Sequence, residues 1–152
     1  MIIASQNLTN FDIPLPEDTI FRINLAWVDS LSMLESILKK HHGREIFLDL
    51  PRNRTKPPNN KYSIEELESI LENFKNIKFL AISNVNSDED LKPFLQIIPE
   101  NCVIIPKIES PLGVQNIKNI TSKLGTKKIV MLDHDDLYSS LLKIDKGTEK
   151  FQ

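Results

Sequence analysis

One lysine and two groups of carboxylates stand at spacings that can bring them into a single site. Lys107 and Glu109 close an apolar run, and an acidic cluster at 133–136 closes the next one. Alternate residues of a strand share a face, so Lys107 and Glu109 point the same way. If the two runs are neighbouring parallel strands, Glu109 and Asp136 converge on one divalent cation, with Lys107 beside it to meet the charge of a substrate.

The chemistry of these side chains favours Mg²⁺ or Mn²⁺. Two carboxylates that leave room for water and substrate oxygens suit such hard cations, whereas this part of the sequence lacks the nitrogen and sulfur ligands that zinc prefers. The alternative interpretation is a solvated acidic run beside an ion pair at the end of a strand.

Short apolar runs alternate with amphipathic helical patterns along the chain. The runs predicted to be strands lie at 21–25, 45–50, 78–83, 102–107 and 128–132. Serines that can cap helices stand between them, and Ser63 forms a capping box with Glu66. This alternation predicts right-handed βαβ units. The expected fold is α/β, an incomplete (β/α)₈ TIM-barrel-like parallel sheet with five βα units, and the alternative is an open doubly wound sheet.

Two of the predicted helices carry residues that should shape them. Pro93 should kink or shorten the helix that Ser87 opens. The next helix has Ser110 as its cap and Pro111 at its first position, and it is expected to run to Gly125. Its inward-facing residues are predicted to be Val114, Ile117, Ile120 and Leu124.

Polar residues gather where the predicted strands end. They are Asn24, Asp49, Ser83, Lys107 with Glu109, and the acidic cluster at 133–136. Ligands bind at the carboxyl ends of parallel strands in open sheets and in barrels, so these positions form one candidate site. Turn chemistry by itself also collects polar residues at strand ends, which is the alternative.

Five motifs resemble, in order, strands two to six of the pyruvate kinase barrel. They are FRINL at 21–25, FLDLP at 47–51, AISNV at 81–85, IPKIE at 105–109 and VMLDHDDL at 130–137. The resemblance covers residues 20–142 and implies a phosphoenolpyruvate or pyruvate site. It places Arg22 toward phosphate, Asn24 and Asp49 at a monovalent-cation position, Lys107 as the catalytic residue beside the phosphoryl group or enolate, and Glu109 with Asp136 on the divalent metal.

Several residues depart from that family. Ala26 and Leu50 replace a serine and a threonine, which argues against a K⁺ site. Asp135 replaces a glycine and is grouped with Ser83 among the substrate-binding residues, although its carboxylate should repel an anionic substrate. The large lid domain is reduced to residues 52–61, so phosphoryl transfer would lack the closure that excludes water.

The predicted function is therefore Mg²⁺-assisted enolate chemistry on a small anionic α-keto acid, as in a carbon–carbon lyase or aldolase rather than a working kinase. The run at 136–141 is also similar to the metal loop of the citrate-lyase β-subunit-like aldolases. The alternative is a degenerate, non-catalytic pyruvate kinase-like domain that binds a ligand or a partner, which the substitutions at Ala26, Leu50 and Asp135 favour.

Length and charge limit the remaining possibilities. The 152 residues suit one domain, divided into an N-terminal segment at 1–19, a partial barrel at 20–142 and a C-terminal tail at 143–152. A net charge of −2 offers no footprint for nucleic acid, and no apolar run is long enough for a membrane, so the cytoplasm is expected. Cys102 is predicted to be a buried, reduced thiol. Five βα units cannot close a barrel of eight, so the chain is expected to be a fragment of a longer barrel protein, and the alternatives are a partial barrel completed by a partner chain and an open sheet. The sheet edges left exposed are expected to pair in a homodimer.

Overall fold

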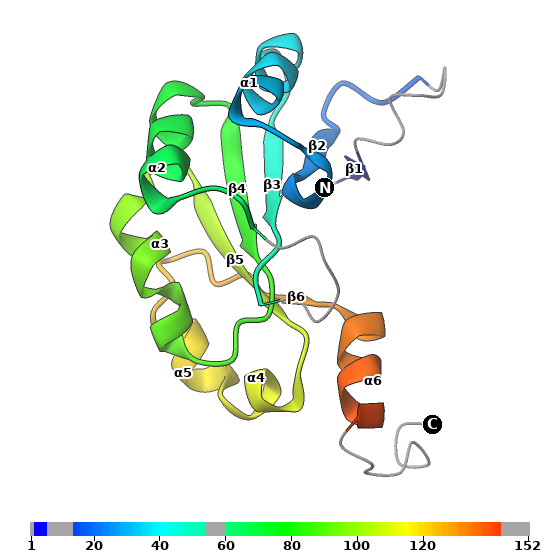
Figure 1. Cartoon of the computed structure of the whole chain (residues 1–152), viewed down its shortest axis with the longest axis vertical. Coiled ribbons are helices and arrows are strands. Elements are labelled where there is room, and N and C mark those ends of the chain that lie inside the picture. The colour runs from blue at the N-terminus through cyan, green and yellow to red at the C-terminus, as the bar shows by residue number, and fades with distance from the viewer. Residues whose placement is uncertain (1, 6–13, 54–59, 144–152) are drawn as a thin grey trace.

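The structure is a computed structural model that describes residues 2–5, 14–53 and 60–143 (Figure 1). Six parallel strands form one sheet in the order β1-β2-β3-β4-β5-β6. The strands are β1 (Ile3–Ser5), β2 (Ile20–Asn24), β3 (Ile46–Leu50), β4 (Ile77–Ile82), β5 (Val103–Ile108) and β6 (Met131–Leu132). The α-helices are α1 (Leu31–Lys40), α2 (Ile64–Asn73), α3 (Lys92–Ile97), α4 (Pro111–Gln115), α5 (Ile117–Ser122) and α6 (His134–Lys143).

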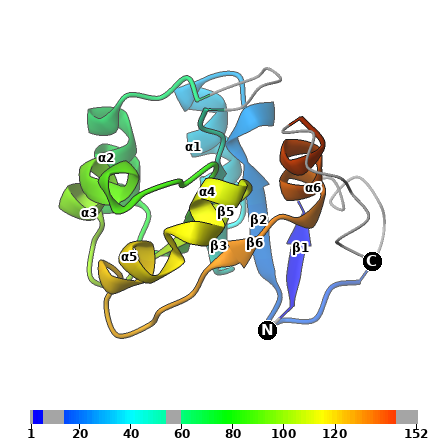
Figure 2. The ribbon, with the colours of Figure 1, turned by 90° about the horizontal axis from the view of Figure 1, so that it is seen from below.

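The order of the strands decides between the two predicted architectures. A doubly wound sheet reverses its order at a switch point, whereas a barrel adds each strand beside the previous one. Here every strand lies next to its neighbours in sequence, and the sheet curls as half of a barrel (Figure 2). The incomplete barrel-like sheet is therefore confirmed. One more strand is present than the five expected, because Ile3–Ser5 pairs with β2.

The two faces of the sheet bury different apolar clusters. The larger cluster lies between the strands and the helices that follow them, and it includes Ile23, Leu48 and Ile104. Helices α1, α2, α3 and α5 lie on that outer side of the sheet in Figure 2. A smaller cluster on the inner face consists of Ile20, Phe47, Ala81 and Ile105, with Phe79, Val103, Ile129 and Met131 packed against it.

Alternation along each strand divides the inner face into an apolar and a polar half. On β5, Val103 and Ile105 belong to the inner cluster, so Lys107, two residues later, projects from the same face. The same period places Arg22 beyond Ile20 on β2 and Asp49 beyond Phe47 on β3. The inner face is therefore apolar at the amino end of the strands and charged at their carboxyl end.

One of the two helices predicted to be shaped by proline is confirmed, and the other differs. The helix opened by Ser87 is shortened as expected, to a 3₁₀ turn, η3 (Asp88–Leu91), and the short α3, whose first turn contains Pro93. The helix capped by Ser110 does not run continuously to Gly125, since it breaks at Asn116 into α4 and α5. The break changes the helical phase, so Val114 is 44 % exposed and the prediction that it faces inward is wrong.

Of two further local predictions, one is confirmed in full and one in part. Ser63 and Glu66 form the expected capping box at the start of α2. The last strand is shorter than the predicted 128–132, because only Met131 and Leu132 pair with β5. In the described part of the chain, no helix combines the length and apolar character needed to cross a bilayer.

Candidate functional site

The charged half of the inner face forms a small pocket at the carboxyl ends of the strands. The pocket has a volume of about 110 Å³, well below the roughly 300–1,000 Å³ of a site for a drug-sized ligand. It is lined by Arg22, Asn24, Asp49, Pro51, Ser83, Lys107, Asp133 and Asp136. A pocket of this size suits a cation with its water and the reacting end of a small acid.

Lys107 joins most of the charged groups of the site. Its Nζ lies 3.0 Å from Glu109 Oε1, 3.5 Å from Asp49 Oδ1 and 3.6 Å from Asp133 Oδ2. It also donates a hydrogen bond to Ser83 Oγ at 3.3 Å. Burial alone would lower the pKa of the Lys107 ammonium, but the three carboxylates outweigh burial and raise that pKa. Lys107 therefore stays protonated at neutral pH.

Asp49 links the two cationic side chains of the pocket. Its Oδ2 accepts hydrogen bonds from Arg22 Nε, at 3.1 Å, and from Arg22 Nη2, while its Oδ1 faces Lys107. Asp49 is buried, whereas 29 % of the Arg22 side chain is exposed. Asp49 fixes one edge of the guanidinium, so the remaining donors can meet an anion in the pocket. Asn24 lies opposite Asp49 in the sheet, and its Oδ1 accepts the Ala26 N–H at 3.0 Å.

Three carboxylates converge beside Lys107. Glu109, Asp133 and Asp136 each offer an oxygen, and these oxygens lie within 4.8 Å of one another. Asp133 Oδ1 accepts the Asp136 backbone N–H at 3.3 Å, so Asp133 caps α6 while its Oδ2 faces Lys107. The proximity predicted for Glu109 and Asp136, at the ends of neighbouring parallel strands, is present in the structure.

Glu109 is the most deeply buried of the three, with 3 % of its surface exposed. Its Oε2 accepts the Asn84 backbone N–H at 3.2 Å. Its Oε1 is in ion-pair contact with Lys107 but takes no well-aligned hydrogen bond from any described residue. Burial raises the pKa of the Glu109 carboxyl, Lys107 opposes that rise, and Asp133 and Asp136 add to it. Oε1 has a second lone pair besides the one that faces Lys107, and a cation between the three carboxylates could use it.

The charge balance and the donor atoms fit a hard divalent cation. The site brings together Arg22 and Lys107 with Asp49, Glu109, Asp133 and Asp136, a formal charge of −2 when all six are ionised. Three carboxylate oxygens, with space for water, are ligands that Mg²⁺ and Mn²⁺ accept. A cation of charge +2 would balance the formal charge of the group.

Not every residue named from the sequence joins the site. Seven of the eight meet at or directly beneath the pocket, but Asp135 does not, because its side chain is 101 % exposed and lies 3.6 Å from the His134 ring. Successive residues of a helix are turned by about 100°, so Asp135 cannot share the face that carries Asp136. Asp133 takes part instead. The spacing of three between Asp133 and Asp136 is the sequence signal that would have identified it.

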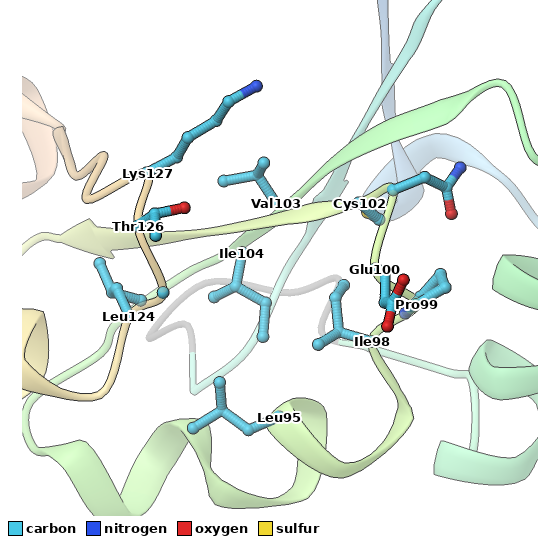
Figure 3. A pocket seen from close by; sticks show the side chains of 12 residues that line it. Leu95, Ile98, Pro99, Glu100, Cys102, Val103, Ile104, Leu124, Thr126 and Lys127 are labelled. Atoms are coloured by element: carbon cyan, nitrogen blue, oxygen red, sulfur yellow. The ribbon is translucent and has the colours of Figure 1, made fainter.

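A second cavity lies at the opposite end of β5 (Figure 3). It measures about 380 Å³, and apolar side chains from Leu95, Ile98, Ile104 and Leu124 line it. Cys102 also lines it, but burial raises the pKa of the thiol to about 12, so the thiolate is scarce at neutral pH. The amino ends of barrel strands serve stability rather than chemistry. The charged pocket is therefore the candidate site.

Comparison with known proteins defines the fold without naming a family. No family model matches the chain, and no curated protein is similar to it. A similar solved structure is RipC from Yersinia pestis, which is 18 % identical with a TM-score of 0.54. The match covers 80 % of this chain and 55 % of RipC, so the chain spans little more than half the length of RipC. At this identity the likeness shows the shared fold alone.

The resemblance to pyruvate kinase is wrong. No family model supports it, and the solved structure reported above as similar is RipC. The five motifs share an arrangement that any parallel barrel-like sheet can have, in which an apolar strand ends in a polar residue facing the same edge. Such a pattern identifies a fold, because it follows from how strands alternate and end.

Proposed function

We propose that the chain binds Mg²⁺ or Mn²⁺ through Glu109, Asp133 and Asp136 and stabilises the enolate of a small α-keto acid, as a carbon–carbon lyase or aldolase. The observation that carries this proposal is the convergence of three carboxylates, with oxygens within 4.8 Å of one another, around the buried Glu109, whose Oε1 has the Lys107 ammonium as its one polar neighbour among the described residues. When bound, the divalent cation would polarise the keto oxygen of the substrate as a Lewis acid.

The two cationic side chains have different parts in this proposal. Among the described residues the Arg22 guanidinium donates to Asp49 alone, through Nε and Nη2, so its other donors would hold the substrate carboxylate. Lys107 would place its positive charge near the oxygen on which negative charge develops. The carboxylates hold the proton on Lys107, so it is a poor nucleophile, and the proposal excludes a Schiff base at this residue.

The non-catalytic alternative has one observation in its favour. Lys107 and Arg22 are already paired with carboxylates, so the charges of the pocket satisfy one another to a large extent. A module that binds a cation and an acid without catalysis needs no more than this. The two functions differ in whether a bound α-keto acid loses a proton.

A titration with Mn²⁺ tests the cation site. Wild-type protein should bind one Mn²⁺ by isothermal titration calorimetry at pH 7, and Glu109→Gln and Asp136→Asn should each weaken binding by at least about tenfold. Asp135→Asn is the matched control, because it removes an adjacent carboxylate that lies outside the pocket. Absence of binding, or an equal loss in Asp135→Asn, would refute the site.

Proton exchange then separates the enzyme from the binding module. With Mg²⁺ in D₂O, the wild type should exchange the methyl protons of pyruvate, as followed by NMR, whereas Asp136→Asn should not. Protein that binds Mn²⁺ and pyruvate but leaves the methyl protons in place would support the non-catalytic alternative.

The exposed edges of the sheet support a second copy as partner. Among the described residues ten large apolar side chains are exposed, and eight of them lie in β1, β6, α4 or α6 or directly before one of these two strands. These are Ile2, Ile3, Leu112, Val114, Val130, Leu132, Tyr138 and Leu142. Exposed apolar surface at open sheet edges favours association, and we propose a homodimer through these edges.

A further inference from the structure

The loop that follows β4 holds one oxygen of the Glu109 carboxylate. Asn84 in this loop has a φ of 52°, in the left-handed region that residues with a Cβ rarely adopt. In that conformation its backbone N–H donates a hydrogen bond to Glu109 Oε2 at 3.2 Å. Asparagine tolerates left-handed backbone better than most residues, which is consistent with its presence here.

Hydrogen bonds on both sides of Asn84 keep the loop in this shape. The Asn84 side-chain amide donates to the Arg52 carbonyl at 3.1 Å, and the Asn86 amide donates to the Asn84 carbonyl at 3.1 Å. The next peptide is tied to β5, because the Val85 N–H donates to the Lys107 carbonyl at 3.1 Å. The loop is therefore anchored to β5, from which Lys107 reaches the pocket, and to the segment after β3.

Helix α4 packs against the loop that follows β4. A Cβ added at Gly113 would lie 2.7 Å from the Val85 carbonyl oxygen, so the backbone of α4 approaches the loop as closely as glycine allows. Ser110 donates a hydrogen bond to the Asn86 side chain, and the Asn116 amide donates to the Asn86 carbonyl at 2.8 Å. These contacts leave little room for the loop to move away from Glu109.

The geometry points to Asn84 as a positioning residue of the cation site, an inference that rests on the proposed function. Its N–H binds Oε2 and so leaves Oε1 beside Lys107, in a carboxylate group that offers an oxygen within 4.8 Å of oxygens of Asp133 and Asp136. A hydrogen bond to one oxygen of a ligating carboxylate fixes the rotation of the group and the direction of its other lone pairs. Asn84 acts through Glu109 and does not itself contact the cation.

A pair of substitutions separates the backbone effect from the side chain. Asn84→Ala and Asn84→Gly both remove the side-chain amide and keep the N–H, but only alanine carries the Cβ that disfavours a positive φ. Asn53, with a φ of 51°, provides the matched control, since Asn53→Ala and Asn53→Gly make the same change at an exposed residue. Circular dichroism and urea denaturation would establish that each variant is folded.

Mn²⁺ affinity, measured calorimetrically well below the melting temperature, is the deciding quantity. Asn84→Ala should bind Mn²⁺ roughly 5-fold to 30-fold more weakly than wild type, the factor expected from the cost of a left-handed residue with a Cβ. Asn84→Gly should stay within about threefold of wild type, because glycine adopts the same φ freely. The two Asn53 variants should differ in stability but not in affinity. Gly113→Ala, which presses on the loop from α4, should also weaken binding.

The outcomes distinguish this inference from the proposed function. If Asn84→Ala loses stability as Asn53→Ala does and still binds Mn²⁺ with wild-type affinity, Asn84 is structural and the inference is overturned. Equal weakening in Asn84→Gly and Asn84→Ala overturns it as well, because the backbone conformation would then not matter. If the wild type binds no Mn²⁺, or if Glu109→Gln binds it equally well, the proposed function fails, and the positioning role falls with it.

Discussion

Replacing Lys107 with methionine should reveal how strongly the charges of the site depend on one another. Lys107 is 5 % exposed, and three carboxylates lie between 3.0 and 3.6 Å from its Nζ. Methionine fills similar space without charge. Lys107→Met therefore removes the positive charge that lies between the three carboxylates and leaves them to repel one another. Removing one partner of a buried ion pair typically costs about 3–5 kcal/mol.

The size of the loss can be bounded from the pKa of Glu109. The folded variant can relieve the repulsion by protonating this buried carboxyl, whose pKa is already raised from the usual 4.5. Protonation at pH 7 costs about 1.36 kcal/mol for each pH unit above that value, or about 3.4 kcal/mol. The free energy of unfolding of Lys107→Met should therefore be lower than that of the wild type by about 3 kcal/mol at pH 7 and by less than about 1 kcal/mol at pH 5.

The sign of the pH dependence of stability follows from the raised pKa of Glu109. A carboxyl whose pKa is higher in the folded state than in the unfolded state binds protons more readily when folded, so the contribution of Glu109 to stability is greatest at low pH and declines as pH rises above about 4.5. Loss of Lys107 removes the charge that opposes this rise in pKa and should make the decline steeper.

Urea denaturation at pH 5 and pH 7 in the presence of a chelator measures the effect as the difference between variant and wild type at each pH. Lys39→Met is the control, because Lys39 forms a helical pair with Glu35 while 69 % of its side chain is exposed. Such a pair contributes about 0.3–0.5 kcal/mol. If Lys107→Met lowers the free energy of unfolding no more than Lys39→Met does, or by the same amount at both pH values, Lys107 does not stabilise the charge of Glu109 and the prediction is refuted.

Two further predictions concern the rest of the fold. The Cys102 thiol, with its pKa near 12 and 7 % exposure, should react with a disulfide reagent at pH 8 about two to three orders of magnitude more slowly in native protein than in urea, and equal rates would show that the thiol is accessible. Light scattering at rising concentration should show dimers, and Leu132→Lys, which places a charge on the exposed edge strand β6, should shift the protein toward monomers. A wild type that stays monomeric at every concentration would remove the proposed homodimer.

Features of the fold that repeat along the chain could be predicted from the sequence. Apolar runs separated by capped helices predict a parallel sheet, and the Ser63 box marks a helix start because its two hydrogen bonds involve residues only three apart. Side chains alternate between the two faces of a strand, so Lys107 and Glu109 lie on the same face. Because the strands are parallel, their carboxyl ends all lie at the same edge of the sheet. These inferences use periods of two to four residues, which are visible without a tertiary structure.

The sequence could not supply the details that depend on neighbours far along the chain. The helix breaks at Asn116, whose side-chain amide donates a hydrogen bond to the carbonyl of Asn86, thirty residues earlier. No local sequence pattern predicts this break. Asp133 and Asp135 have the same side chain, and the spacing of three to Asp136 favours Asp133 only once α6 is known to begin at His134. The family resemblance was wrong for a related reason, since motifs set by strand geometry recur in unrelated barrels.

Alternation and capping are local, so the sequence is enough to predict a parallel α/β sheet with polar residues at the carboxyl ends of its strands. The burial and protonation of Lys107 among three carboxylates, one of them Asp49, 58 residues earlier in the chain, become apparent only in the folded structure. Charge depends on distance and on the loss of water, and neither is set until strands far apart in sequence lie side by side.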